Sequence, residues 1–310
     1  MKVMITGGAG FIGSHVVDGA LKGGYEVIVI DNFSYGKEEN VQHLKNNKNV
    51  KIYKRDICED LSDLFKGIDV VFHLAALPRV QYSIDHPDEA HKTNVDGTAN
   101  LLEMSRKNNV KRFIFMSSSS VYGDQEKMPY TEDMEPNPMS PYALHKLVGE
   151  LYCKLYHQLY GMETISMRGF NIFGPRQDPS GGYACLIPRF IHLINKDTRP
   201  TINGDGEQTR DFVYVKDVVD ALMLAAKTKN KQAFGEVFNV GSGKRFSVNE
   251  VTKIILKTAN KNIQPIHGPP VIEPRNTLAG IEKAKKILGW QPNYNFEKGM
   301  EETFQFFKNY

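Results

Sequence analysis

The stretch Thr6-Gly7-Gly8-Ala9-Gly10-Phe11-Ile12-Gly13 lies between a β-branched run at residues 3–6 and an amphipathic run that predicts a helix. Glycines at this spacing allow a tight turn and a close approach of the backbone to a pyrophosphate. The positive end of the following helix dipole would then face the phosphate charge. We expect a dinucleotide-binding turn, with contacts from Gly7, Gly10, Phe11, Ile12 and Gly13. The alternative is a glycine-rich turn without a ligand.

The strand expected at residues 26–30 runs into Asp31, which lies 18 residues after Gly13. This is close to the ~20-residue spacing typical of the acid that binds the ribose hydroxyls of a dinucleotide. A carboxylate here repels the 2′-phosphate of NADP, so we expect NAD as the cofactor. His73, at the end of a later strand, is expected to be structural. Further cofactor contacts are expected at two strand ends: Asp56 and Ile57 beside the adenine, and Leu74, Ala75 and Ala76 in the sheet-top crevice.

Short apolar runs alternate with longer amphipathic runs through the first half of the chain. Strands are predicted at residues 3–6, 26–30, 50–53, 70–74 and 113–117, and helices at 14–23, 88–108 and 141–160. This alternation predicts an α/β fold with a doubly wound parallel sheet covered on both faces. Proline and glycine become more frequent after Gly174. We therefore expect one domain at 1–170 and a smaller lobe at 171–310, with part of 211–244 returning to the first domain.

Composition excludes several classes of protein. The 310 residues are 41% hydrophobic and 24% charged with a net charge of +3, as in ordinary globular proteins, and nucleic acid is not an expected partner. Cys58, Cys153 and Cys185 form no paired motif, so we expect reduced thiols and no metal site. No apolar run approaches the ~18 residues of a membrane span and no signal peptide is apparent, so a cytoplasmic protein is expected.

Tyr142 and Lys146 are four positions apart, so they share one face if Pro141 opens a helix. A second such pair, Tyr294 and Lys298, lies in the last 20 residues, away from the expected cofactor sheet. Removal of a hydride from a carbinol carbon requires a base for the hydroxyl proton. A phenol, with an ordinary pKa of ~10, serves as that base at neutral pH only where positive charge lowers its pKa. Lys146 and an oxidised nicotinamide would supply such charge.

Many segments together resemble the extended short-chain dehydrogenase/reductase family, and within it the UDP-hexose 4-epimerases. The segments are TGGAGFIG at residue 6, DN at 31, RDI at 55, HLAA at 73, NVDGT at 94, SSSSVYG at 117, SPYALHK at 140, FNIFGPRQDP at 170, NGDGEQTRDFVYVKD at 203, FNVGSG at 238 and LGWQP at 288. The resemblance implies a Rossmann sheet with a small C-terminal lobe that binds a UDP-sugar. It also implies a homodimer, for which a predicted helical stripe that includes Leu151, Leu155 and Leu159 is either the seam or ordinary core.

The resemblance also assigns roles to individual residues. Ser118 would hold the reacting oxygen of the substrate, Tyr142 would be the base, and Lys146 would bind the nicotinamide ribose and lower the pKa of the tyrosine. Further positions follow: Asn32 and Asn94 on the cofactor side, Asn171 and Arg210 on the substrate side with Arg210 facing the diphosphate, and Thr277 as the residue that limits the size of the sugar. Pro270 stands where many members have a second diphosphate arginine, which Arg275 is a candidate to replace.

Two positions separate the reactions of this family. Sugar dehydratases carry Asp-Glu directly after the catalytic residue, whereas this chain has Ser119 and Ser120, which supply no carboxylate for an elimination. We therefore expect 4-epimerisation of UDP-glucose and UDP-galactose through a 4-keto intermediate. The small Thr277 leaves space for the N-acetyl forms of these sugars. The alternatives are another nucleotide-sugar reductase or dehydratase, or a non-catalytic NAD-binding sensor.

Overall fold

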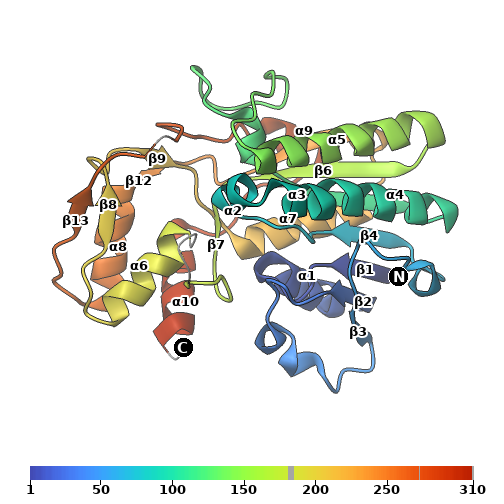
Figure 1. The fold of residues 1–310 in the computed structure, drawn as a ribbon, viewed down its shortest axis with the longest axis horizontal. Coiled ribbons are helices and arrows are strands. Elements are labelled where there is room, and N and C mark those ends of the chain that lie inside the picture. Colours follow the sequence, from blue (N-terminus) through green and yellow to red (C-terminus); the bar gives the residue numbers. More distant parts are fainter. Residues whose placement is uncertain (181–184, 272, 309–310) are drawn as a thin grey trace.

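The computed structural model describes residues 1–180, 185–271 and 273–308. A seven-stranded parallel sheet in the order β11-β6-β5-β4-β1-β2-β3 forms the larger unit, which confirms the predicted fold class (Figure 1). Its strands are β1 (Lys2–Thr6), β2 (Glu26–Asp31), β3 (Val50–Lys54), β4 (Val70–His73), β5 (Arg112–Ser118), β6 (Glu163–Gly169) and β11 (Glu236–Val240). The predicted strands correspond to β1 to β5, and the strand pattern did not reveal β6 and β11.

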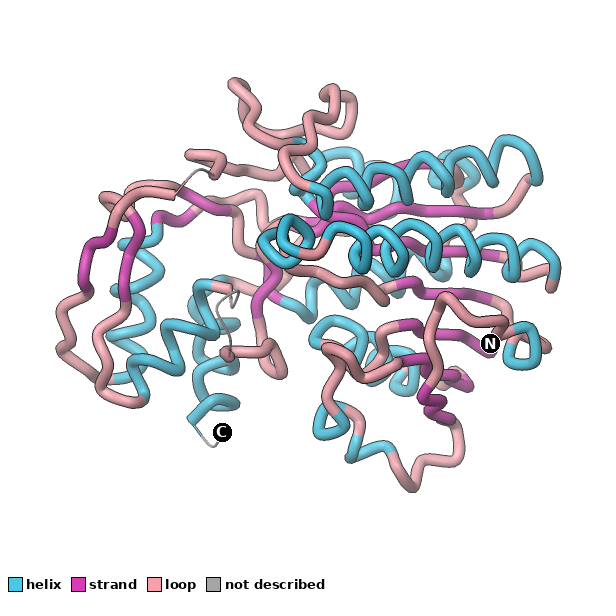
Figure 2. Tube along the Cα trace, in the orientation of Figure 1, coloured by secondary structure: helices cyan, strands magenta, loops and turns pink. Residues whose placement is uncertain are grey.

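Helices cover both faces of this sheet, as its buried strands require (Figure 2). On one face, α1 (Phe11–Lys22) and α7 (Val215–Lys227) pack on side chains such as Val3 and Val29. On the other, α4 (Gly97–Lys107) and α5 (Pro141–Tyr160) pack on side chains such as Met4 and Ile30. The alternation of inward and outward residues along β1 and β2 thus divides the core into two halves.

The single helix expected at residues 88–108 is interrupted. After α2 (Val80–Asp85), the chain forms α3 (Pro87–His91), a π-helical turn (Lys92–Asp96) and then α4. The wider π turn changes the direction of the side chains that follow α3. It turns the buried Asn94 toward the segment after β4, a placement that a continuous helical pattern does not predict.

The smaller unit has its own apolar core, formed by side chains such as Phe173, Phe190 and Phe296. Its elements are α6 (Leu186–Asn195), α8 (Val248–Ala259), α10 (Phe296–Lys308) and three two-stranded sheets. The sheets pair β7 (Ile172–Phe173) with β10 (Val213–Tyr214), β8 (Thr201–Asn203) with β13 (Ile266–Gly268), and β9 (Thr209–Arg210) with β12 (Phe246–Ser247). Helix α9 (Glu282–Leu288) packs beside β11. The division at residue 170 stays a prediction.

In the three described ranges, no helix combines the length and apolar character that a membrane span requires.

A buried ion pair joins α5 to β6 behind the end of β5. The guanidinium of Arg168 donates two hydrogen bonds to Glu150, of 2.9 and 2.7 Å, and both side chains are about 4% exposed. The hydroxyl of Ser117 donates a third hydrogen bond to the same carboxylate, at 2.5 Å. The guanidinium also lies 4.5 Å from the centre of the Tyr122 ring. These contacts fix the backbone next to Ser118.

Removal of one partner of this pair would leave the other charge buried and unpaired. We expect Glu150→Ala to lower the free energy of unfolding by about 3–5 kcal/mol, measured by denaturant titration. A matched control is the double variant Glu150→Leu with Arg168→Met, which removes both charges and should recover much of the loss. A single variant as stable as the wild type would contradict this role for the pair.

Candidate active site

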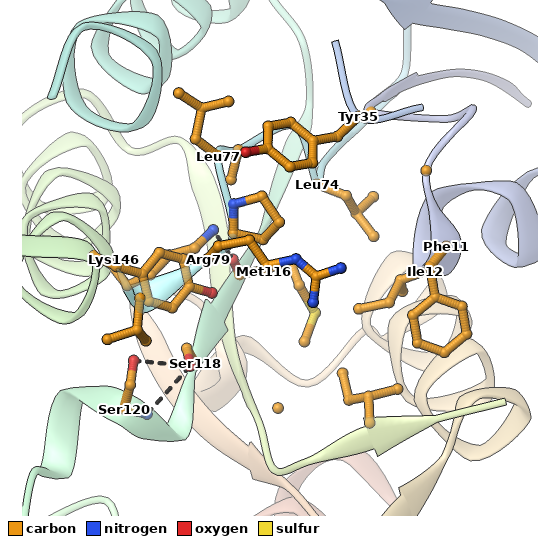
Figure 3. A pocket seen from close by; sticks show the side chains of 18 of the residues that line it. Phe11, Ile12, Tyr35, Leu74, Leu77, Arg79, Met116, Ser118, Ser120 and Lys146 are labelled. Carbon is orange, nitrogen blue, oxygen red and sulfur yellow. Dashed lines mark hydrogen bonds between the residues drawn. The ribbon is translucent and has the colours of Figure 1, made fainter. Parts of the chain in front are cut away.

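A cleft of about 940 Å³ lies at the carboxyl edge of the sheet and is closed on one side by the smaller unit. It opens where β1 lies beside β4, the point at which the chain reverses its direction across the sheet. Figure 3 shows side chains from several strand ends pointing into it. The predicted site residues that line it are Gly7, Gly10, Phe11, Ile12, Gly13, Asp31, Asn32, Ile57, Leu74, Ala75, Ala76, Ser118, Tyr142, Lys146, Asn171, Arg210 and Thr277.

The glycine turn after β1 has the shape that a pyrophosphate needs. Gly7 has a φ of +69°, and a Cβ there would lie 2.7 Å from the backbone nitrogen of Ala75. A Cβ on Gly13 would overlap the carbonyl oxygen of Gly7. A Cβ on Gly10 would approach only that same oxygen, at 3.1 Å, and would fill the open space before α1. The turn is therefore a cradle that side chains would block, and it fits a dinucleotide.

Asp31 ends β2 and lines the cleft beside the glycine turn. Its carboxylate accepts hydrogen bonds of 2.8 Å from the backbone nitrogens of Ala9 and Phe33. Burial raises the pKa of this carboxyl group, while the two backbone hydrogen bonds oppose the shift. The side chain of Asp31 thus ties the end of β2 to the glycine turn.

Two predicted cofactor residues lie outside the lining. Asp56 accepts hydrogen bonds of 2.8 Å from the side chain of Asn32 and from the backbone nitrogen of Cys58. Asn94 is 3% exposed, accepts from the nitrogen of Leu77 at 2.8 Å and donates to its carbonyl oxygen at 3.1 Å. The structure therefore gives both residues supporting positions behind the wall of the cleft.

The residues proposed for the chemistry come together as the spacing predicts. Ser140 caps α5 by accepting from the nitrogen of Ala143 at 3.2 Å, and Pro141 occupies its first turn. Lys146 donates to the carbonyl oxygen of Met116 at 2.7 Å, with its nitrogen 5.9 Å from the centre of the Tyr142 ring. The hydroxyl of Ser118 accepts a hydrogen bond of 2.9 Å from the Ser120 hydroxyl (Figure 3).

Burial controls the protonation of this group. It raises the pKa of the Tyr142 phenol to about 12, against opposing effects from the Ser118 hydrogen bond and the charge of Arg79. It also lowers the pKa of Lys146 to about 8, although the Glu150 carboxylate opposes this shift. Lys146 by itself therefore does not produce an ionised phenol at neutral pH. The positive charge needed has to come from a ligand as well as from the chain.

The smaller unit supplies the other wall of the cleft. Asn171 donates to the carbonyl oxygen of Asp211 at 3.1 Å, and the guanidinium of Arg210 lies 2.9 Å from the Glu273 carboxylate. The hydroxyl of Thr277 is buried without a partner in the described ranges. Arg275 pairs with Asp205, at 2.8 and 3.0 Å, and lies outside the lining. In this arrangement Arg275 does not face the cleft, and its role as a replacement for the missing arginine at residue 270 stays a prediction.

Sequence reasoning missed several side chains that line the cleft. They are Tyr35, Lys37, Arg79, Arg176, Gln177 and Cys185. Arg79 follows β4 by six residues, and loops at the carboxyl ends of parallel strands are the expected place for ligand contacts, so its position was a usable signal. His73 is structural as expected, because Thr6 and Thr98 each lie 2.8 Å from one of its ring nitrogens and burial lowers its pKa to about 3.

The glycine cradle, the acid after β2 and the Ser-Tyr-Lys group define a dinucleotide-binding α/β fold of the short-chain dehydrogenase/reductase type. Residues 3–241 match the NAD dependent epimerase/dehydratase family. The chain belongs to this family, which confirms the expected resemblance and the expectation of NAD as the cofactor.

Three relatives show the range of substrates in their names. The chain is 37% identical to UDP-glucose 4-epimerase of Mycolicibacterium smegmatis, covering 100% of this chain and 99% of that protein. UDP-N-acetylglucosamine 4-epimerase from Methanobrevibacter ruminantium, solved with UDP-N-acetylmuramic acid, is 38% identical with a TM-score of 0.95 and coverage of 99% and 98%. UDP-glucuronic acid 4-epimerase from Bacillus cereus, solved with UDP-glucuronic acid and NAD, is 36% identical with a TM-score of 0.93 and coverage of 100% and 99%.

The lowered pKa of Lys146 predicts how stability depends on pH. The unfolded chain binds a proton on this side chain up to its ordinary pKa of 10.5, whereas the folded chain releases it near pH 8. This contribution to the free energy of unfolding is therefore present above pH 10.5 and is lost as the pH falls through 8. As the pH rises from 8 to 10.5, we expect the free energy of unfolding of the wild type to increase by about 3 kcal/mol relative to that of Lys146→Met.

Denaturant titrations of both proteins at pH 7 to 10.5 measure this change. The comparison cancels other groups that titrate in the same range. A difference that is constant with pH would contradict the burial of an ionisable Lys146.

Proposed function

We propose that this chain is an NAD-dependent 4-epimerase of UDP-sugars that interconverts UDP-glucose and UDP-galactose, and also accepts their N-acetyl forms. The observation that carries the proposal is the group of Ser118, Tyr142 and the buried Lys146 at the carboxyl end of β5, beside a cradle for a dinucleotide. The names of the relatives support the reaction class.

The chain's own residues would move one proton. The Tyr142 phenolate accepts the proton of the C4 hydroxyl, and the Ser118 hydroxyl holds the reacting oxygen at hydrogen-bond distance. Lys146 is anchored by the Met116 carbonyl and places a positive charge below the phenol ring. A bound NAD, for which the glycine turn and Asp31 form a cradle, would supply the acceptor and donor of the C4 hydride. Delivery of the hydride to the opposite face of C4, with return of the proton from Tyr142 to the C4 oxygen, would invert C4 with no net oxidation.

The acidic residues of the cleft favour this reaction over dehydration. Among the described lining residues, the carboxylates are Asp31, Asp178 and Glu273. Asp31 lies at the adenosine end, Asp178 pairs with Lys37 at 3.1 Å and Glu273 pairs with Arg210. Each is engaged elsewhere, and Ser119 and Ser120 supply none. A 6-hydroxyl elimination would lack its acid and base.

Tyr142→Phe removes the proton acceptor and leaves the ring in place. We expect a loss of 10²- to 10⁴-fold in the rate of UDP-glucose epimerisation, with bound NAD retained. The matched control is Tyr294→Phe, since Tyr294 also precedes a lysine by four positions but lies outside the cleft. It should keep the wild-type rate.

Product analysis tests the reaction class. Substrate labelled with tritium at C4 should keep its label, because the hydride returns to the carbon that lost it. Accumulation of NADH or of a free 4-keto product would favour a reductase or dehydratase. A wild-type protein that turns over no UDP-sugar would point to a sensor.

We further propose a homodimer through α5. Leu151, Leu155 and Leu159 are exposed along this helix, whereas Tyr152 and Tyr156 on the same helix pack toward the sheet core. The predicted stripe is thus divided, and its exposed leucines form an apolar row without a partner within the described chain.

Charges in this row should separate the subunits. We expect the double variant Leu155→Glu with Leu159→Glu to be monomeric and the wild type to be dimeric, as measured by light scattering after size exclusion. A wild type with the mass of one chain would overturn the proposed dimer.

A further inference from the structure

Arg79 lies at the reaction end of the cleft and has no role in the proposed function so far. Its side chain projects into the centre of the cavity, between the walls that carry Met116 and Leu74 (Figure 3). Its Nη1 donates a hydrogen bond of 3.4 Å to the sulfur of Cys185, the residue that precedes α6 in the smaller unit. The guanidinium thus reaches from the loop after β4 across the cleft to the side on which the substrate is proposed to bind.

The other arginines of the cleft are already paired with carboxylates. Arg55 lies 2.7 Å from Glu59, Arg176 lies 2.7 Å from Asp18, and Arg210 lies 2.9 Å from Glu273. Within residues 1–180, 185–271 and 273–308, Arg79 has no carboxylate within the 4.0 Å limit that defines an ion pair. Its only hydrogen-bond acceptor there is a thiol, which is a weak acceptor. A guanidinium with five donors is therefore available to an anion that enters the cleft.

The backbone that carries Arg79 is held in place from both sides. Two residues earlier, Leu77 is clamped through its nitrogen and its oxygen by the buried side chain of Asn94. Four residues later, the hydroxyl of Ser83 accepts a hydrogen bond of 3.0 Å from the nitrogen of Tyr142. The position of Arg79 relative to the Tyr142 helix is thus set before any ligand binds, which lowers the cost of recognition.

Different parts of a bound substrate would meet different arginines. The cofactor pyrophosphate has its cradle at Gly7 to Gly13, and the UDP diphosphate is proposed to lie at Arg210. The part of a nucleotide sugar left for Arg79, next to Tyr142 and Ser118, is the hexose. Neutral hexoses offer only hydroxyl groups to a guanidinium. A carboxylate matches its fork with two parallel charge-assisted hydrogen bonds.

We propose that Arg79 is a specificity-determining residue that binds a carboxylate on the hexose, so that the substrates of this chain include nucleotide-linked acidic sugars. The inference rests on the proposed function for the position of the hexose. In this proposal the carboxylate of the substrate replaces the thiol of Cys185, which is a weak hydrogen-bond acceptor for Arg79.

The experiment compares UDP-glucuronate with UDP-glucose on the holoenzyme. We expect Arg79→Gln to lower the ratio of kcat/KM for the acidic sugar to kcat/KM for the neutral sugar by at least about tenfold. The Kd of UDP-glucuronate from calorimetry should rise by a similar factor. Arg79→Lys keeps the charge and loses the planar fork, so its ratio should lie between those of the wild type and Arg79→Gln. Arg189→Gln is the matched control, because Arg189 is exposed on α6 and outside the lining, and it should keep the wild-type ratio.

Three results would overturn the inference. One is an unchanged ratio in Arg79→Gln, and another is equal binding of UDP-glucuronate by this variant and the wild type. The third is an equal loss for both sugars together with loss of bound NAD, which would assign the guanidinium to the cofactor diphosphate. If Arg79→Gln does not fold, the lysine variant decides by the same ratio. A wild type that epimerises neither sugar contradicts the proposed function. In that case the Kd of UDP-glucuronate, compared between the wild type and Arg79→Gln, still tests whether Arg79 binds the carboxylate.

Discussion

The position of β4 beside β1 is the constraint on which the site depends. The chain builds β1, β2 and β3 in one direction and then returns to pair β4 with the free edge of β1. The connections on the two sides leave in opposite directions, so a crevice opens at the carboxyl ends of the central strands. The glycine turn, Asp31, Arg79 and Ser118 all follow or end these strands. Residues far apart in sequence converge there because the sheet is parallel.

Precision at the reaction end comes from polar groups in the core. Glu150 lies one turn after Lys146 on α5 and binds both Arg168 of β6 and Ser117 of β5. Lys146 in turn binds the Met116 carbonyl on β5. A helix held only by apolar contacts could slide or rotate slightly at little cost. Directional hydrogen bonds to two strands remove that freedom, so the phenol and the serine keep one relative position.

The sequence predicted best what depends on local chemistry. The glycine turn, Asp31 and the Tyr142–Lys146 spacing are local patterns, and the residues predicted from each of them line the cleft. Strand β6 was missed because its buried residues include Thr164, Ser166 and Arg168, so it lacks the continuous apolar run of a buried strand. The π turn at Asn94, the supporting position of Asp56 and the unpaired state of Arg79 depend on packing between distant segments. No spacing rule contains that information.

Burial links protonation in the site to its ligands. It moves Tyr142 and Lys146 in opposite directions, toward the neutral form of each, with pKa values of about 12 and 8. A bound cation then favours the phenolate, because charges interact strongly where water is excluded. A carboxylate on the hexose would have the opposite effect and raise the pKa of the phenol further. Its pairing with Arg79 would neutralise that charge next to Tyr142, so the residue that selects an acidic sugar would also protect the base that acts on it.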